Sequence, residues 1–331
     1  MPATDVLLVS LGATAGLRAS DAELAASITR AGASVVVAGA EQQPDVRTLM
    51  RTDLRWALAA RAAARAGIAE HEPRAILYST TTAALLWPRP GAIRFDALAA
   101  VTRPGRHGLW QRPLERRRLA QAPCLVPLSP GSVSEAPSVV PPDHELVIVP
   151  VPVEPSGLGE PWAQREIAAI TYAADPHKKG LDRVLAAWAQ VRRDGETLLV
   201  AGLDRERLPD PPDGVVVSGR LDREAYRELL RRSRVFVTAP RREDHGIAQL
   251  EALNDGCVLV TTPAPGPYAA LEIARQLDGR LVGDDLAAML RTALDDPAPR
   301  YTARSIDLLA PFTRAAIDRV VADELLPRLL T

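Results

Sequence analysis

The segment from residue 235 to residue 262 constrains the fold more than any other part of the chain. Two short apolar runs, at 235–238 and 257–262, have the composition of buried strands. Between them lie a polar turn and a segment of helix length that begins near Gly246. A strand, a helix and a second strand in this order form a βαβ unit, which predicts a parallel sheet covered by helices.

The turn ahead of this helix has the features of an anion site. The amides of Gly246, Ile247 and Ala248 open the helix and have no acceptor within it, so they can bind a phosphate oxygen. Glu243 precedes the turn, and Glu251 lies about two helical turns further on. An anion site between two carboxylates suits a diphosphate that carries a hydroxyl-bearing sugar at each end.

This pattern resembles the Glu-x7-Glu signature of retaining glycosyltransferases of the GT-B fold, especially glycosyltransferase family 4, or group 1. The resemblance implies that Glu243 holds sugar hydroxyls, that Glu251 binds the nucleotide ribose and that the three amides bind the donor diphosphate. The family usually has an aromatic residue before the glycine, where this chain has His245. The sugar pocket is therefore expected to differ in shape.

Two adjacent lysines form a second signal. Lysine and arginine total 40, and only Lys178 and Lys179 are lysines, which leaves 38 arginines, a bias typical of a GC-rich bacterial genome. The two lysines lie between a strand expected over 167–172 and a helix expected over 181–188. In the family this loop carries an arginine and a lysine that clamp the donor diphosphate, and Lys179 matches that lysine.

The position of the clamp arginine is filled by Ala174. Either Lys178, His177 or an arginine of the pair 241–242 takes its place, or the donor is bound more weakly than in the family.

The first half of the chain carries weaker signals. Gly12 and Gly16 lie in an expected flexible loop after the first strand, where the family has a glycine-rich loop near the donor phosphates and the acceptor. A plain tight turn is the alternative. The loop lacks the Gly-x-Gly-x-x-Gly pattern, and no acidic residue ends the strand at 34–38, so a nicotinamide dehydrogenase is disfavoured.

Two further positions are candidates by resemblance. Asp96 follows a strand expected over 92–95 and replaces a family histidine that contacts the donor sugar, so it can orient a sugar or acceptor hydroxyl or simply cap a turn. Gly219 and Arg220 follow the strand expected over 214–218, where the family borders the nucleobase. The acidic pairs at 284–285 and 295–296 are interpreted as helix-end residues, and no metal site is predicted.

Length and periodicity predict the domain organisation. A chain of 331 residues suggests two domains, and strands alternate with helices in both halves. We expect an α/β protein of GT-B type, with two Rossmann-like doubly wound domains facing a cleft. The first domain covers 1–152, the second covers 153–310 after a proline-rich linker, and a helix within 311–331 crosses back to the first. In the first domain a helix is expected over 20–31, opened by a capping box of Ser20 and Glu23, and another over 46–70.

Charge and cysteine usage limit the partners and the location. The formal net charge of −1 gives no global field that favours nucleic acid. Cys124 and Cys257 lie in apolar runs and are expected to be buried thiols in a reducing compartment. The basic run at 103–118 fits an anionic acceptor, a membrane surface or a solvated helix face. We therefore expect a cytoplasmic protein, with a peripheral contact at the inner membrane face as one option.

The resemblance implies a retaining glycosyltransferase that uses a UDP- or GDP-sugar and needs neither a metal nor a cofactor. Lys179, Glu243 and Asp96 are the expected catalytic residues, and the acceptor is a small molecule, a glycan or a lipid-linked sugar. Two alternatives stay open. One is an inactive protein of the same fold that binds sugar nucleotides or acts as a scaffold, and the other is a sugar-nucleotide epimerase.

Overall fold

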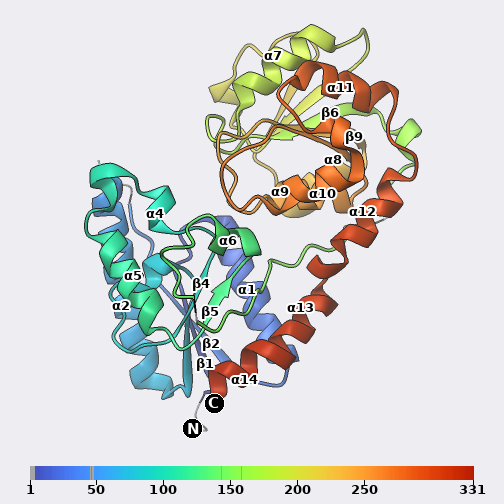
Figure 1. Cartoon of the computed structure of the whole chain (residues 1–331). Coiled ribbons are helices and arrows are strands. Elements are labelled where there is room, and N and C mark those ends of the chain that lie inside the picture. The colour runs from blue at the N-terminus through green and yellow to red at the C-terminus, as the bar shows by residue number, and fades with distance from the viewer. Residues whose placement is uncertain (1–3, 45, 47, 143, 158) are drawn as a thin grey trace. The chain divides into compact units, whose positions relative to one another are not determined.

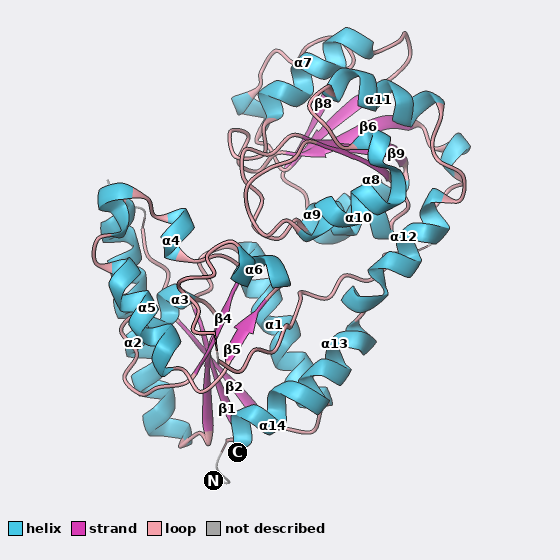
Figure 2. Cartoon of the chain, viewed as in Figure 1, coloured by secondary structure: helices cyan, strands magenta, loops and turns pink. Residues whose placement is uncertain are grey.

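The computed structural model describes residues 4–331 apart from 45, 47, 143 and 158. The chain forms two compact units: unit 1 comprises Met1–Pro152 and Arg314–Thr331, and unit 2 comprises Val153–Thr313. Each unit contains a five-stranded sheet in which neighbouring strands are parallel, with helices packed around it (Figures 1 and 2). Parallel strands are joined by helical crossovers that cover both faces of the sheet. These two parallel sheets with their helices confirm the predicted α/β class.

The sheet of unit 1 has the order β2-β1-β3-β4-β5. Its strands are β1 (Val6–Ser10), β2 (Val35–Gly39), β3 (Ala75–Tyr78), β4 (Ala92–Phe95) and β5 (Leu125–Pro127). Its helices are α1 (Ala15–Arg30), α2 (Leu49–His71), α3 (Thr81–Ala84), α4 (Ala99–Thr102), the 3₁₀ turn η1 (Gly105–Gly108), α5 (Gln111–Gln121), α6 (Pro130–Ser134), α13 (Arg314–Val320), the π-helical turn η6 (Val321–Leu325) and α14 (Leu326–Leu330). The strand order reverses between β1 and β3, and open α/β sheets bind ligands at such a switch point.

The first helix begins earlier than the sequence predicts. It starts at Ala15, and the hydroxyl of Thr14 accepts a hydrogen bond from the Leu17 amide at 3.2 Å. The capping box expected at Ser20 is therefore wrong, and Ser20 is a buried residue within the helix. Small residues at 15 and 16 resemble a loop in sequence, but the Thr14 cap supplies an acceptor for the first turn and offsets the low helix propensity of glycine.

The last helices of the chain pack on unit 1, as the sequence predicts. Ile317, Val321 and Leu325 are buried in the same cluster as Val6 and Leu8 of β1. The Asp318 carboxylate accepts a hydrogen bond from the Ser27 hydroxyl and pairs with Arg30, both at 2.6 Å. An apolar face with a polar rim therefore attaches this segment to α1 and the sheet.

The sheet of unit 2 has the order β10-β9-β6-β7-β8. Its strands are β6 (Ile167–Tyr172), β7 (Leu198–Ala201), β8 (Val215–Gly219), β9 (Ser233–Thr238) and β10 (Val258–Thr261). Its helices are η2 (Trp162–Gln164), α7 (Leu181–Val191), η3 (Arg205–Arg207), α8 (Arg223–Arg231), α9 (Ile247–Asn254), α10 (Ala269–Asp278), η4 (Gly279–Leu281), α11 (Leu286–Asp295), α12 (Tyr301–Leu309) and η5 (Ala310–Phe312). The βαβ unit expected over 235–262 is present as β9, α9 and β10.

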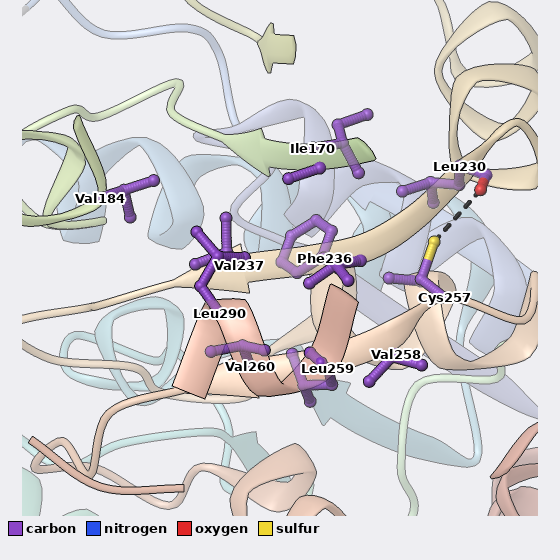
Figure 3. Packing of buried hydrophobic residues seen from close by; sticks show 14 of the residues in the cluster. Ile170, Val184, Leu230, Phe236, Val237, Cys257, Val258, Leu259, Val260 and Leu290 are labelled. Atoms are coloured by element: carbon purple, nitrogen blue, oxygen red, sulfur yellow. Dashed lines mark hydrogen bonds between the residues drawn. The ribbon is translucent and has the colours of Figure 1, made fainter. Parts of the chain in front are cut away.

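The central strands of unit 2 are apolar on both faces because helices bury both faces of the sheet. Phe236 and Val237 of β9 are buried, as is Val260 of the neighbouring strand β10, among the side chains drawn in Figure 3. Cys257 lies in this core, and its thiol donates a hydrogen bond to the carbonyl of Leu230 at 3.1 Å. Burial raises the pKa of this thiol to about 12. Cys124 and Cys257 are both buried and free, as the sequence predicts.

Candidate functional site

Two loops leave the sheet of unit 2 at its switch point. β6 and β9 are neighbours, but the chain runs from β6 outward to β7 and from β9 to β10 on the other side. The loops that follow β6 and β9 therefore diverge from the same sheet edge, the usual position of a ligand site. Lys179 Nζ lies 2.5 Å from Glu243 Oε2 and joins the two loops. The fold thus unites the lysine loop and the Glu-x7-Glu motif.

Two glycines allow these loops to approach each other and begin their helices. Gly180 precedes α7 and Gly246 precedes α9, and both have left-handed backbones with φ of 66° and 85°. A Cβ on Gly180 would lie 1.8 Å from the Ala239 carbonyl oxygen, and one on Gly246 would lie 2.9 Å from the Tyr268 ring. A larger residue at either position would separate the loops or displace the ring.

Glu243 is fixed from several directions. It is buried, and its Oε2 accepts a hydrogen bond from Gln249 Nε2 at 3.0 Å in addition to the contact with Lys179. Its amide donates to the Pro265 carbonyl at 3.0 Å, and a Cβ on Gly266 would lie only 2.1 Å from the Glu243 carbonyl oxygen. Gln249 was not predicted as a site residue. Its signal in the sequence is a polar side chain between the apolar residues of α9.

A second set of charges lies beside the first. Lys178 Nζ and Arg242 Nε contact the two carboxylate oxygens of Asp244 at 2.8 and 2.7 Å. Burial alone would raise the pKa of Asp244, but Lys178 and Arg242 outweigh it and lower the pKa. Asp244 therefore stays ionised and holds the two cations together. The sequence did not mark it as a site residue.

The structure also describes the surroundings of Ala174. Ala174 is exposed, and Arg241 is committed elsewhere, because it contacts both carboxylate oxygens of Asp182 at 2.9 and 2.7 Å. Lys178 and Arg242 share Asp244, as described above. Arg241 is thus bound to the start of α7. Among the candidate replacements for the family arginine, it is the least suited to bind a diphosphate.

Glu251 lies in a different environment from Glu243. Its Oε1 is 3.1 Å from Arg223 and 3.5 Å from Arg227, two residues one turn apart on α8. Arg227 also contacts Asp255, with two hydrogen bonds of 2.5 and 2.8 Å. Burial raises the pKa of Glu251, opposed by the charges of Arg227 and Arg223. These arginines were not predicted, because their link to Glu251 crosses from one helix to another.

The remaining candidates of unit 2 lie around this edge. His245 is buried, and its ring centroid is 6.5 Å from that of Phe312. Gly219 has a φ of 85°, and its carbonyl accepts a hydrogen bond from the Gly202 amide at 3.0 Å. Arg220 is mostly exposed and pairs with Asp204 at 2.8 Å. β8 is an edge strand two positions from β6, so Gly219 and Arg220 lie along the same sheet edge as Lys179.

The candidates of unit 1 lie at the carboxyl edge of its own sheet. Gly12 has a φ of 59°, and its carbonyl accepts hydrogen bonds from Arg18 at 2.8 Å and Gln42 at 3.0 Å. Gly16 lies in the first turn of α1 rather than in a loop, so the expectation of a flexible glycine loop is wrong. Asp96 Oδ1 accepts a hydrogen bond from the Ala97 amide at 2.8 Å, a geometry that fits the turn-capping alternative.

The acidic pairs have the structural roles that the sequence suggests. Asp285 caps α11 by accepting a hydrogen bond from the Ala288 amide at 3.0 Å, and Asp295 pairs with Arg193 at 2.8 Å. Within the described ranges, no group of three or more His, Cys, Asp or Glu residues is arranged to hold a metal ion.

A family model matches the region that contains these loops. Residues 166–296 match the model of the family described as glycosyl transferases group 1. This part of unit 2 is similar to group 1 glycosyltransferases. The matched range runs from the strand before the lysine loop to the end of α11 and contains both Lys179 and the Glu-x7-Glu motif. Among curated protein sequences, none matches the chain.

Solved structures extend the comparison to both units. HepE of Anabaena, in complex with UDP-glucose, is 14% identical with a TM-score of 0.69, and the match covers 97% of this chain and 99% of HepE. Sucrose-phosphate synthase from Thermosynechococcus elongatus is 15% identical with a TM-score of 0.68 and coverage of 97% and 98%. WaaG, a glycosyltransferase involved in lipopolysaccharide biosynthesis, is 16% identical with a TM-score of 0.67 and coverage of 96% and 95%. The predicted GT-B fold is confirmed.

The helices of the described chain include none that is both long enough and apolar enough to span a membrane.

Proposed function

We propose that the protein is a retaining glycosyltransferase that transfers a sugar from a nucleotide diphosphate sugar to an acceptor hydroxyl. The observation that carries this proposal is the pairing of Lys179 with Glu243 at the start of α9. The first amides of a helix lack intrahelical acceptors and attract anions. A donor diphosphate can therefore replace Glu243 as the partner of Lys179. Glu243 is then available to bind sugar hydroxyls.

The nucleotide end of the donor is assigned to Glu251. Glu251 lies about one and a half helical turns from Gly246, a separation that suits a ribose on the far side of the diphosphate. In solved structures, HepE binds UDP-glucose and the pneumococcal O-GlcNAc transferase GtfA binds UDP and GlcNAc. We therefore propose a UDP-sugar as the first donor to test, followed by a GDP-sugar.

The proposed chemistry assigns most of the catalysis to charge stabilisation. The acceptor hydroxyl attacks on the face that the diphosphate leaves, and the leaving phosphate oxygen takes its proton, so the configuration is retained. Lys179 and the amides of Gly246, Ile247 and Ala248 stabilise the negative charge that develops on the departing diphosphate. Asp96, from unit 1, orients a hydroxyl. These groups can neutralise the diphosphate without a metal, so we expect EDTA to leave the transfer rate unchanged.

The decisive experiment separates the two carboxylates by calorimetric binding. We expect one of UDP, GDP, ADP and TDP to bind, and Glu251→Ala to weaken that binding. We expect Glu243→Ala to spare the bare nucleotide and to weaken only the sugar nucleotide. Glu224→Ala on α8 is a matched control, since Glu224 is exposed. Equal losses for both ligands in Glu243→Ala and Glu251→Ala would contradict the assignment.

A second candidate, an inactive sugar-nucleotide-binding protein, is favoured by Ala174. The position expected to hold an arginine carries a methyl group, and Arg241 is committed to Asp182. An inactive protein would bind the nucleotide without hydrolysing or transferring the sugar. Because Ala174 is exposed, Ala174→Arg should fold normally. If the clamp is only weakened, this variant should raise the transfer rate; if the protein is inactive for another reason, the rate stays at zero.

A further inference from the structure

Helix α2 exposes an apolar stripe that flanks its buried face. The buried residues of the helix are Asp53, Trp56, Ala57, Ala60, Ala64 and Gly67. Met50, Leu54 and Leu58 recur every fourth residue next to this buried face, and they are 37%, 41% and 50% exposed. Residues spaced by four align on one helix face. We call these three residues the apolar stripe.

A fourth exposed leucine lies in a neighbouring segment. Leu109 is 63% exposed and directly follows η1, which contacts α2. This segment is held to the helix by Arg103, whose guanidinium contacts both carboxylate oxygens of Asp53 at 2.7 and 3.1 Å. Asp53 is on the buried side of α2, so the ion pair fixes η1 beside the helix and presents Leu109 at the surface.

The charges around the stripe are almost all positive. Residues 48–66 and 101–121 together contain ten arginines and two carboxylates, a formal charge of +8 in a chain whose net charge is −1. Both carboxylates, Asp53 and Glu115, are buried. Arg51 and Arg55 are exposed on α2, and Arg106 is exposed on η1. The solvent therefore meets apolar side chains and cations here, without an exposed acidic residue in either segment.

The stripe also has a defined place on unit 1. α2 follows β2, so its first turns lie near the carboxyl edge of the parallel sheet. Gly12 and Asp96 also follow strands at that edge. A surface bound by the stripe would thus be close to the edge of unit 1 to which the proposed function assigns hydroxyl orientation.

We propose that the apolar stripe, Leu109 and the arginines around them dock unit 1 on an anionic lipid bilayer. An exposed helix face with leucines between arginines can insert its apolar side chains at the headgroup level while the guanidiniums contact lipid phosphates. A protein partner would instead be expected to offer carboxylates to these arginines and a groove to this helix. Exposed leucines and guanidiniums on one surface favour the boundary between lipid chains and anionic headgroups, which accommodates both kinds of side chain at once. This proposal does not depend on catalysis, so it can fail or hold independently of the proposed function.

Vesicle cosedimentation of the full chain tests the proposal. The probes are phosphatidylcholine vesicles with and without phosphatidylglycerol, at low and high salt. We expect binding to the anionic vesicles at least about tenfold stronger than to the neutral ones, and weaker binding at high salt, since exposed charges are screened. Leu54→Ser with Leu58→Ser, and separately Arg51→Glu with Arg55→Glu, should each weaken binding about tenfold or more.

Ile306→Ser is the matched control, because Ile306 is a helical residue of α12 that is also 50% exposed. It should bind like the unaltered protein, and all variants should keep its melting temperature. Equal binding to neutral and anionic vesicles, or no binding to either, would overturn the proposal. So would sedimentation velocity that shows a dimer which Leu54→Ser with Leu58→Ser dissociates, because a second copy would then cover the stripe.

Discussion

At the scale of single residues, the contact between Lys179 and Glu243 has two consequences. The ammonium is held at a carboxylate that precedes the start of α9, and this buried carboxylate has its charge compensated. Gln249 supports the same oxygen and would keep one partner on Glu243 after the lysine moves to a ligand. The pair therefore holds two opposite charges at the position proposed for the donor diphosphate.

We predict that Lys179→Ala lowers kcat/KM for sugar transfer by the equivalent of about 3 kcal/mol, because a preorganised cation opposite the leaving diphosphate is lost. The measurement is steady-state transfer with the donor found by calorimetry. Arg183→Ala is the control, since Arg183 is an exposed cation on α7 and is not among the candidate donor-binding residues. It should cost much less, and unchanged turnover in Lys179→Ala would end the assignment of this residue.

At the scale of elements, buried polar contacts connect short helices that have little stability of their own. α4 has only 4 residues, and its first amide, that of Ala99, donates to both carboxylate oxygens of Glu115 on α5 at 3.1 and 2.8 Å. Such a helix depends on tertiary contacts, because nucleating an isolated turn is unfavourable. Glu115 thus attaches α4 to α5, which contains the second half of the basic run at 103–118.

Burial raises the pKa of Glu115 to about 7, from 4.5 for an ordinary glutamate. The folded state therefore holds the proton more tightly than the unfolded chain. Protonated Glu115 therefore contributes roughly 3 kcal/mol to the free energy of unfolding. This contribution is fully present below pH 4.5 and is lost as the pH rises through 7.

We predict that Glu115→Gln, which stays neutral and keeps an acceptor, has a higher melting temperature than the unaltered protein at pH 8 and a smaller advantage at pH 5. Differential scanning fluorimetry at the two pH values measures the difference. Glu70→Gln is the control, since Glu70 is exposed on the neighbouring helix α2 and should show no such pH dependence. An equal effect of Glu115→Gln at both pH values would mean that the ionisation of Glu115 does not change between them, which would contradict the prediction.

At the scale of the whole molecule, the chain builds unit 1 from its two ends and unit 2 from its middle. The side chains of α13, η6 and α14 complete a cluster with β1 and α1, whereas the candidate donor site consists of residues of unit 2. The stability of unit 1 should therefore depend on the C-terminal segment, and the binding of a nucleotide should not.

We predict that Leu325→Ala destabilises unit 1 by about 2–5 kcal/mol, because Leu325 is fully buried and its loss leaves a cavity. Thermal unfolding should show an earlier first transition, while calorimetry shows unchanged binding of the nucleotide to unit 2. Leu329→Ala is the control, since Leu329 is only partly buried against the same cluster. Loss of nucleotide binding in Leu325→Ala would show that the two units do not act independently.

The sequence by itself determined the features that depend on local order. The apolar runs fixed the strands, their alternation with helices predicted two parallel sheets, and the Glu-x7-Glu spacing placed Glu243 and Glu251 around one helix start. The predicted start of the first helix was wrong. The Thr14 side chain caps α1, so the helix begins at Ala15 and includes Gly16. Local periodicity carries strong information about elements and weaker information about their ends.

Only the tertiary structure decided which charges meet. Lys179 and Glu243 are 64 residues apart in the chain and 2.5 Å apart in space, because β6 and β9 are neighbours in the sheet. Arg227 reaches Glu251 and Asp255 because α8 packs against α9. A single sequence contains the residues of such contacts but not their partners, since pairing between distant segments depends on strand order and helix packing.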